Sequence, residues 1–421
     1  MVSVMLYPPI CNSRSDFASI EPLEGRRLLS ASIVGSTLLV EGTGGVDTIE
    51  ITLDSADLIV RINSDTRAFA SGEVNRIEIH AGGGDDAARM ISDVTQDALI
   101  LGEAGNDTLM GGSGSDTLVG GAGSDLLNGG AEAQDDAANN LADFSDRTAD
   151  LSMAENQVTG GGDTDTLVGN IQRLAFGSGN DSLFINGSGP GSIRSVDGGP
   201  GDDSIEMLSF EDVTAHGGPG NDRILILVPG FTGHYFGDGG NDVFTVQRSS
   251  ATNRDFNGGA GADTVDYRGF INEFWPVTIS LDDVANDGSP TEWESQSGRD
   301  NAHSDVERII GTPGPDTIRG GDGNEILYGM AGNDTIRGGA GNDRIYGGDG
   351  NDWINGDDGN DVIYGQAGND RLFGGAGIDF LAGGPGMDLI RGGIGVDRII
   401  LNSRRGDFRG NTGDLFTLIV S

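Results

Sequence analysis

The sequence contains no lysine, a single cysteine and no run of eighteen apolar residues. One cysteine, Cys11, cannot form an intramolecular disulfide bond, so the chain is not stabilised internally by disulfides. Without a long apolar run, no segment is expected to span a bilayer as a helix. The absence of lysine also excludes Schiff-base catalysis and other chemistry that depends on a lysine amine.

Basic residues are also scarce, because 25 of them face 66 acidic residues and give a formal net charge of −41 over 421 residues. Nucleic acids and anionic membranes are recognised by cationic surfaces, so neither is an expected partner. The acids are not scattered along the chain but recur at one position of a repeat. This regularity favours a binding role over a merely solvated surface.

Ten tandem nonapeptides fill residues 311–400 without an insertion, from GTPGPDTIR at Gly311 to GGIGVDRII at Gly392. Their template is GGxGxDxUx, in which U is aliphatic and is always Ile or Leu, from Ile318 to Ile399. A strict short period predicts a solenoid, and this period is typical of calcium-binding β-helix repeats. Position six carries the acids Asp316, Glu325, Asp334, Asp343, Asp352, Asp361, Asp370, Asp379, Asp388 and Asp397.

The glycines at positions one, two and four predict a tight turn with positive φ angles. We expect the first six residues of each nonapeptide to form a loop and the last three a short strand, with position eight pointing inward. Two nonapeptides would form one coil, so that equivalent acids stack every second repeat at about 4.8 Å. The prediction is two columns, one of Asp316, Asp334, Asp352, Asp370 and Asp388, the other of Glu325, Asp343, Asp361, Asp379 and Asp397.

A column of bare carboxylates destabilises a fold, because unit charges at this spacing repel by about 3 to 4 kcal/mol at an effective dielectric constant near 20. Calcium takes six to eight oxygen ligands in flexible geometry, whereas Mg²⁺ demands a tighter octahedron. We therefore expect several Ca²⁺ ions between the turns, held by the position-six acids and by carbonyl oxygens of positions one and three. The predicted carbonyl ligands are Gly329, Ala331, Gly338, Ala340, Gly347, Asp349, Gly356, Asp358, Gly365 and Ala367.

Each nonapeptide has a thin core. Ordering nine residues costs on the order of 13 kcal/mol, while burying one Ile or Leu returns only about 1.5 to 3 kcal/mol. The block at 311–400 is therefore predicted to be largely disordered without calcium and to fold on binding it.

The rest of the chain predicts a looser solenoid. Residues 33–130 alternate strands and turns and end in three nonapeptides from Gly102, with Asp107, Asp116 and Asp125 at position six. Residues 131–310 read as degenerate coils with inserted loops beginning at Asp143 and Asp266, the second of them rich in acids. Single glycine turns begin there at Gly160, Gly198, Gly217, Gly237 and Gly258, and both calcium-bound and metal-free turns fit them.

The nonapeptides at 102–128 and 311–400 are similar to the RTX, or haemolysin-type calcium-binding repeat, family. This resemblance implies an all-β parallel β-roll with calcium in its turns, and an extracellular or cell-surface location reached after export in the unfolded state. Residues 1–32 form a targeting-like segment, in which PLEGRRLLSAS from Pro22 resembles the LEPR-XLL segment of secreted planctomycete proteins. Residues 401–421, which end in GDLFTLIVS, form a cap or a tail similar to those of type I secretion substrates.

RTX repeats also accompany enzymes, but the sequence has neither an HExxH zinc-protease motif nor a GxSxG nucleophile motif. The alternative is a secreted polysaccharide lyase or epimerase, for which general acids and bases are available between residues 196 and 275. These candidates are His216, Arg223, His234, Tyr235, Arg248 and Tyr267. The favoured function is a non-catalytic structural or adhesive module of the cell surface or matrix, with calcium and extracellular polysaccharide or cell-envelope components as partners.

Overall fold

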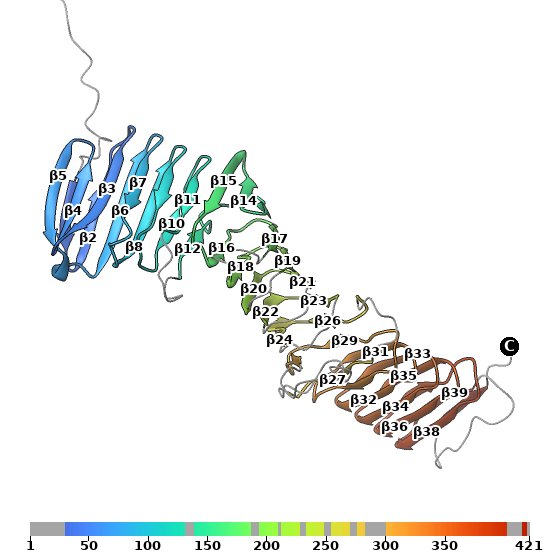
Figure 1. Ribbon diagram of the computed structural model, residues 1–421. Helices are drawn as coiled ribbons and strands as arrows, with labels where there is room; N and C mark the ends of the chain where they lie inside the picture. The colour runs from blue at the N-terminus through green and yellow to red at the C-terminus, as the bar shows by residue number, and fades with distance from the viewer. Residues whose placement is uncertain are drawn as a thin grey trace, which may run out of the picture.

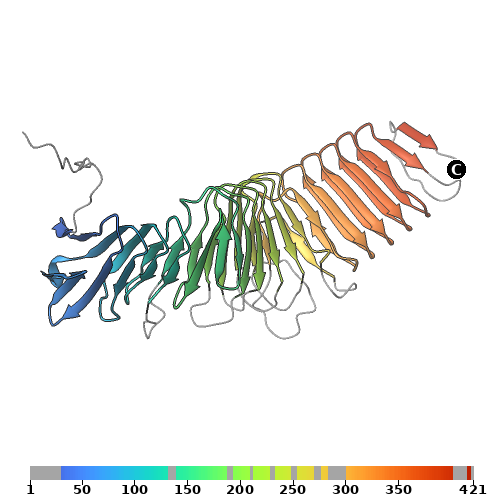
Figure 2. The same cartoon turned by 90° about the horizontal axis from the view of Figure 1, so that it is seen from above.

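The computed structural model describes residues 30–130, 139–186, 193–208, 212–227, 233–247, 254–269, 276–282, 300–401 and 415–418. Within these ranges the chain is all-β, apart from one 3₁₀ turn, η1 (Ser71–Glu73). Its strands wind into an elongated solenoid in which the coils follow one another in chain order (Figures 1 and 2). No helix in the described part combines the length and the apolar composition needed to cross a membrane. The predicted parallel β-solenoid is confirmed.

The first face of the solenoid is a sheet that covers the N-terminal and central coils. Its strands pair in the order β1 (Ser30–Val34), β2 (Thr37–Glu41), β6 (Arg76–Gly83), β8 (Asp97–Ala104), β10 (Thr117–Val119), β12 (Leu141–Asp143), β16 (Arg173–Ala175), β18 (Ser195–Asp197), β20 (Val213–Pro219), β22 (Gly233–Gly240), β24 (Arg254–Asn257) and β28 (Asn301–Ala302). The short strand β25 (Ala260–Gly261) pairs with the end of β22.

The second face runs the length of the molecule. Its pairings form one path, from β5 at one end of the solenoid to β39 near the other (Figure 1). The strands along this path are β5 (Asp65–Ala70), β4 (Asp57–Ile62), β3 (Thr48–Asp54), β7 (Ala87–Met90), β9 (Thr108–Met110), β11 (Leu126–Asn128), β15 (Asp163–Val168), β14 (Gln157–Gly160), β13 (Ser152–Ala154), β17 (Ser182–Asn186), β19 (Ser204–Leu208), β21 (Arg223–Ile226), β23 (Val243–Val246), β26 (Thr264–Asp266), β29 (Arg308–Ile310), β31 (Ile326–Ala331), β33 (Arg344–Asp349), β35 (Val362–Ala367), β37 (Phe380–Ala382), β39 (Arg398–Leu401) and β40 (Leu415–Leu418).

A third sheet replaces the first face in the C-terminal coils, where the solenoid changes direction (Figure 1). Its strands pair in the order β27 (Thr278–Ser280), β30 (Thr317–Arg319), β32 (Thr335–Ala340), β34 (Trp353–Asp358), β36 (Arg371–Ala376) and β38 (Leu389–Ile394). An isolated bridge between Leu281 and Ala302 links it to the first face. The buried guanidinium of Arg254 donates to Asp300 Oδ2 at 2.9 Å at this junction, so an internal ion pair lies where the sheets change.

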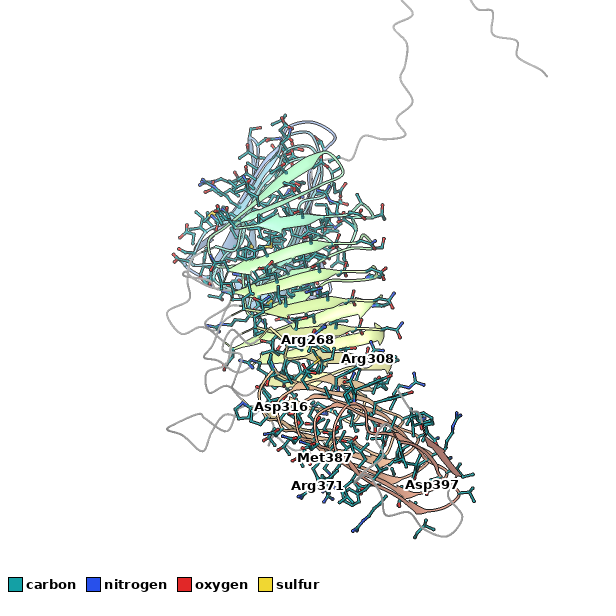
Figure 3. All side chains as sticks on the ribbon, turned by 90° about the vertical axis from the view of Figure 1, so that its right-hand side faces the viewer. Arg268, Arg308, Asp316, Arg371, Met387 and Asp397 are labelled. Carbon is teal, nitrogen blue, oxygen red and sulfur yellow. The ribbon has the colours of Figure 1, made fainter. Side chains whose placement is uncertain are left out.

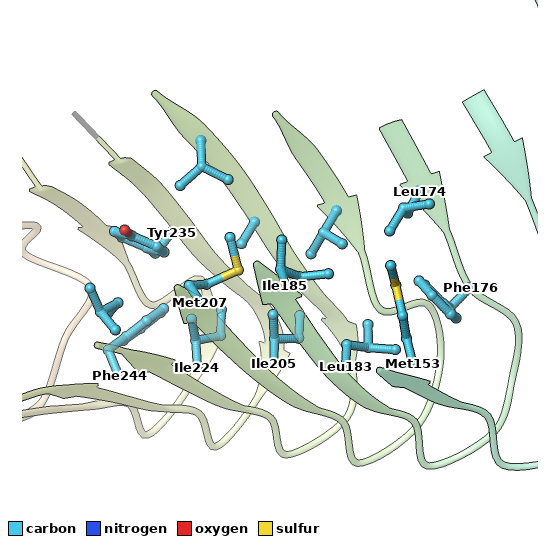
Figure 4. Packing of buried hydrophobic residues seen from close by; sticks show 14 of the residues in the cluster. Met153, Leu174, Phe176, Leu183, Ile185, Ile205, Met207, Ile224, Tyr235 and Phe244 are labelled. Atoms are coloured by element: carbon cyan, nitrogen blue, oxygen red, sulfur yellow. The ribbon is translucent and has the colours of Figure 1, made fainter. Parts of the chain in front are cut away.

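The core follows the aliphatic position of the repeat. All ten position-eight residues from Ile318 to Ile399 are at most 1% exposed, and they pair in register from coil to coil, as Leu327 does with Ile345 and Ile345 with Ile363. The wider central coils fill their interior with larger side chains, among them Met207, Tyr235 and Phe244 (Figure 4). The predicted inward direction of position eight is confirmed.

Most of the nonapeptide strands are longer than predicted, whereas β30 and β37 have the three residues expected. β33 (Arg344–Asp349) covers positions seven to nine of one repeat and positions one to three of the next. Parallel pairing continues through these residues, because Met330 pairs with Gly348 and Ala331 with Asp349. The prediction of a six-residue loop was therefore wrong for the coils with six-residue strands, where the loop is confined to positions four to six.

The five-part division of the chain stays a prediction. Residues 1–29 of the targeting-like segment lie outside the described residues, as do Cys11 and most of the tail after Leu401.

Candidate calcium ladder

The position-six acids are buried at the edges of the solenoid, each directly before a strand. All thirteen predicted acids are between 0 and 3% exposed. The ten acids of residues 311–400 stack in the two predicted columns, in which Oδ1 of one acid accepts the backbone N–H of the acid one coil earlier. Asp334 accepts from Asp316 at 2.7 Å, and Asp343 accepts from Glu325 at 2.9 Å. The same link joins the acids further along both columns, at 2.8 to 3.0 Å.

The second carboxylate oxygen of most of these acids has no hydrogen-bond partner in the structure. This unpaired Oδ2 atom is fully buried in Asp107, Asp125, Asp334, Asp352, Asp361, Asp370 and Asp379. A buried charged oxygen without a partner is costly, so a row of them favours the binding of a positive group. Asp116 and Asp316 differ, because their Oδ2 atoms accept the N–H groups of Gly112 and Thr312 at 2.8 and 2.6 Å.

Backbone carbonyl oxygens approach the same unpaired oxygens. The point where a Cβ atom on Gly329 would lie is 2.3 Å from Asp334 Oδ2 and 2.5 Å from the carbonyl oxygen of Gly347 in the next coil. The corresponding distances at Gly356 are 2.2 Å to Asp361 Oδ2 and 2.4 Å to the Gly374 oxygen. Carboxylate and carbonyl oxygens that converge in a glycine-rich turn are the ligands that calcium prefers. The residues present therefore fit a calcium site.

The position-one glycine is required for space rather than for its φ angle. Positive φ occurs at positions two and four, as in Gly348 and Gly350, but Gly329 and Gly338 at position one do not have it. The predicted positive φ at position one was therefore wrong. A side chain there would meet the carboxylate and the carbonyl oxygen of the next coil.

Three of the five carbonyl oxygens predicted from position three are already acceptors. Those of Asp349, Asp358 and Ala367 accept the position-four N–H groups one coil earlier, at 2.7 to 2.8 Å. A carbonyl oxygen has a second lone pair, so these atoms can still face an ion. Among the described residues, no group of three or more Asp, Glu, His or Cys side chains is placed to hold a metal ion together, so the backbone would supply much of any coordination shell. The assignment of the individual ligands stays a prediction.

Burial changes the acidity of the columns. Loss of solvent raises the pKa of Asp334 to about 8, that of Asp361 to about 7 and that of Asp352 and Asp370 to about 6, although their backbone N–H partners act in the opposite direction. Neighbouring carboxylates raise these pKa values further. The charged columns are therefore unfavourable in the fold unless a cation is bound.

We expect the metal-free protein to lose stability as the pH rises from about 5 to about 8. Because the folded acids have raised pKa values, the folded state binds more protons than the unfolded chain, whose acids titrate near pH 4. The resulting stability is complete below that pH and is lost as the pH rises through about 6 to 8. Thermal unfolding of calcium-stripped protein, followed by circular dichroism, would measure the effect. A melting temperature that rises over this interval would contradict it.

The sequence did not predict the role of position five. Asn351 Oδ1 accepts the Asn369 N–H, and Asn333 Oδ1 accepts the Asn351 N–H, both at 2.8 Å. A matching ladder runs along the other edge through Asn324, Asn342 and Asn360. The recurrent Asn before the acid was the available signal. This ladder supports the coil stacking that aligns the acids.

The predicted acid–base candidates are not gathered at one place. Tyr235 and Tyr267 lie in the core, and burial raises the pKa of Tyr235 to about 12. His216 and His234 lie on the outer side of the first face, with Nδ1 atoms 3.0 Å from Asp238 and 3.2 Å from Asp255. Arg223 belongs to the second face, and Arg248 lies outside the described residues.

The comparisons with known proteins concern the nonapeptides. The family model of the RTX calcium-binding nonapeptide repeat, which spans four copies, matches residues 101–133 and, in overlapping windows, 303–336, 320–354, 328–363, 346–381 and 364–399. No curated protein matches the chain.

Proposed function

Given that this chain carries RTX calcium-binding nonapeptide repeats, we propose that it is a secreted, non-catalytic structural or adhesive module of the cell surface or matrix. Its blocks would fold outside the cell, because extracellular calcium modules bind with dissociation constants of roughly 10⁻⁴ to 10⁻³ M. Sites of that affinity stay empty in a low-calcium cytoplasm. The adhesive partner we propose is an acidic extracellular polysaccharide.

The surface charge of the nonapeptide block supports this partner. Residues 311–400 contain fourteen acids, of which ten occupy position six, and six arginines. Once ions neutralise the position-six acids, the arginines outnumber the remaining four acids. The six are Arg319, Arg337, Arg344, Arg371, Arg391 and Arg398, all exposed, and Figure 3 shows Arg371 at the outer surface.

Aromatic side chains stack beside these arginines on the outside of both sheets. The rings of Tyr328 and Tyr346 are 4.8 Å apart and nearly parallel, and those of Tyr346 and Tyr364 are 5.2 Å apart. On the third sheet, the Arg337 guanidinium lies 5.3 Å from the Trp353 ring centroid. Guanidinium groups pair with carboxylates in bidentate fashion, and flat rings pack against apolar surface. This combination of rings and guanidinium groups is the observation that carries the proposal.

Co-sedimentation of the full-length protein with insoluble calcium alginate tests the adhesive role. We expect the double variant Arg337→Ser/Arg371→Ser to bind about tenfold more weakly, which corresponds to about 1.4 kcal/mol. Arg173→Ser, which removes an exposed arginine of the first face, serves as the matched control and should bind as the unchanged protein does. Equal binding by all three proteins would contradict the assignment of this surface.

The same preparations test the absence of catalysis. Incubation with soluble alginate or pectin should produce no unsaturated products, which are detected by ultraviolet absorbance. Turnover that disappears in His234→Ala would instead establish the lyase alternative.

A further inference from the structure

The central coils contain a row of turn acids that the RTX family model does not match. Asp181, Asp203, Asp222, Asp242 and Asp263 directly precede β17, β19, β21, β23 and β26. Each is at most 2% exposed, and all lie between the two matched regions, which end at residue 133 and begin again at residue 303. Four of these acids belong to the isolated glycine turns, for which the sequence left calcium binding open.

The carboxylates of this row have the same geometry as those of the nonapeptides. From Asp203 to Asp263, each Oδ1 atom accepts the N–H of the preceding acid at 2.7 Å, and Asp181 Oδ1 accepts the Leu151 N–H at the same distance. Each Oδ2 atom is buried without a hydrogen-bond partner. A Cβ atom on Gly198 would lie 2.5 Å from Asp203 Oδ2 and 2.6 Å from the Gly217 carbonyl oxygen. The same pattern recurs at Gly237, with 2.3 Å to Asp242 Oδ2 and 2.5 Å to the Gly258 oxygen.

At one turn of the solenoid, an asparagine that supplies its own hydrogen-bond donor takes the place of the acid. Asn140 occupies the position of an acid, since its Oδ1 accepts the Asp116 N–H at 2.7 Å. Its Nδ2 atom donates to the carbonyl oxygens of Gly129 and Asn170, each at 2.7 Å. The amide nitrogen thus lies where an acid would place its unpaired oxygen. Carbonyl oxygens at this point of the turn therefore require a positive or donating group.

At a second turn, the acid is neutralised by an arginine. Asp165 precedes Asp181 among the acids of the second face, and its Oδ2 receives Arg147 Nη2 at 3.2 Å. Arg147 Nη1 also donates to Asp163 Oδ2 at 2.9 Å, and the arginine side chain is only 14% exposed. The first insertion, which begins at Asp143, supplies this arginine. The protein itself therefore places a positive charge beside a turn acid between the N-terminal nonapeptides and the central row.

We propose that the row from Asp181 to Asp263 is a third set of calcium sites, on one edge of the central coils. Successive acids and the position-one carbonyl oxygens, such as those of Gly217 and Gly258, would hold the ions. The row has no side-chain amide like that of Asn140 and no arginine like Arg147 beside Asp165. Its carboxylate oxygens can therefore bind an external cation. Calcium suits it because the oxygens come from carboxylates and carbonyls of flexible turns.

The test is the calcium stoichiometry of the full-length protein, measured by equilibrium dialysis. We expect Asp222→Asn to bind at least one ion fewer per chain than the unchanged protein. Its fold should persist, because an asparagine is accommodated at the turn that contains Asn140. The matched control is Asp202→Asn, which changes the exposed residue directly before Asp203. Asparagine already occupies the equivalent position at Asn180, Asn221 and Asn241. This control should bind the full number of ions.

A second measurement separates a lost ligand from general damage. In metal-free buffer Asp222→Asn should melt at or above the temperature of the unchanged protein, because the amide removes an unpaired charge, whereas in calcium it should melt below it. Asp352→Asn in the nonapeptide block is the reference for an RTX site. If Asp352→Asn lowers the ion count and Asp222→Asn does not, the central row binds no calcium and the nonapeptide sites still stand.

Discussion

Removing calcium from the full-length protein with EGTA should abolish most of the strand signal contributed by residues 311–400. Each of these repeats buries one aliphatic side chain, such as Ile354 or Ile363, and most of them leave a carboxylate oxygen unpaired, as in Asp352 and Asp361. The small core cannot offset the cost of ordering the chain together with the repulsion in the columns. Far-UV circular dichroism before and after chelation measures the loss, and added millimolar calcium should restore the signal. Magnesium at the same concentration is the matched control and should restore less of it.

The N-terminal coils provide an internal comparison. There the core includes Leu38, Val40, Ile49, Ile51 and Ile77, all fully buried, so its stability depends less on ions. Hydrogen exchange in EGTA should therefore keep protection in β2, β3 and β6 while it disappears from β31 to β38. An unchanged strand signal, or uniform loss of protection along the solenoid, would contradict calcium-dependent folding of the nonapeptide block.

Gly350→Ala should have the second largest effect, because it places a methyl group between two coils. Gly350 has a φ of +142°, and a Cβ atom there would lie 1.4 Å from the carbonyl oxygen of Gly332. Neither backbone can move away without breaking the parallel ladder on both sides. Overpacking alone costs about 1 to 3 kcal/mol, and strained backbone adds about 1 to 3 kcal/mol. Thermal unfolding in calcium should show a fall of several degrees or more in the melting temperature.

The control is Gly321→Ala, at position two of the second repeat. Its nearest neighbour is the Leu281 carbonyl oxygen at 3.3 Å from the added Cβ, and its φ is not positive. This variant should melt close to the unchanged protein. Equal melting temperatures for Gly350→Ala and Gly321→Ala would show that the coils are less tightly stacked than the structure indicates.

Some differences between prediction and structure come from contacts between coils. Local propensity predicted positive φ for every glycine of the turn, but at Gly329 the deciding factor is the approach of Asp334 and of the next coil. In the same way, the loop was predicted too long because the strand was assigned only to positions seven to nine, from local propensity. Hydrogen bonds from the neighbouring coil extend the strand beyond these three residues. β33 and β35 extend each other into the turn.

The sequence by itself determined the solenoid, the two acid columns of residues 311–400 and the inward aliphatic position. It did so because a constant period of nine residues maps directly onto a constant geometry. Only the tertiary structure decided that Asp181, Asp203 and Asp222 stack in one row before the strands of the second face, and that Asn140 and Arg147 supply donors elsewhere. The central coils differ in length, so the acids that stack on one another are not separated by a constant number of residues. Their alignment therefore cannot be found from a period in the sequence.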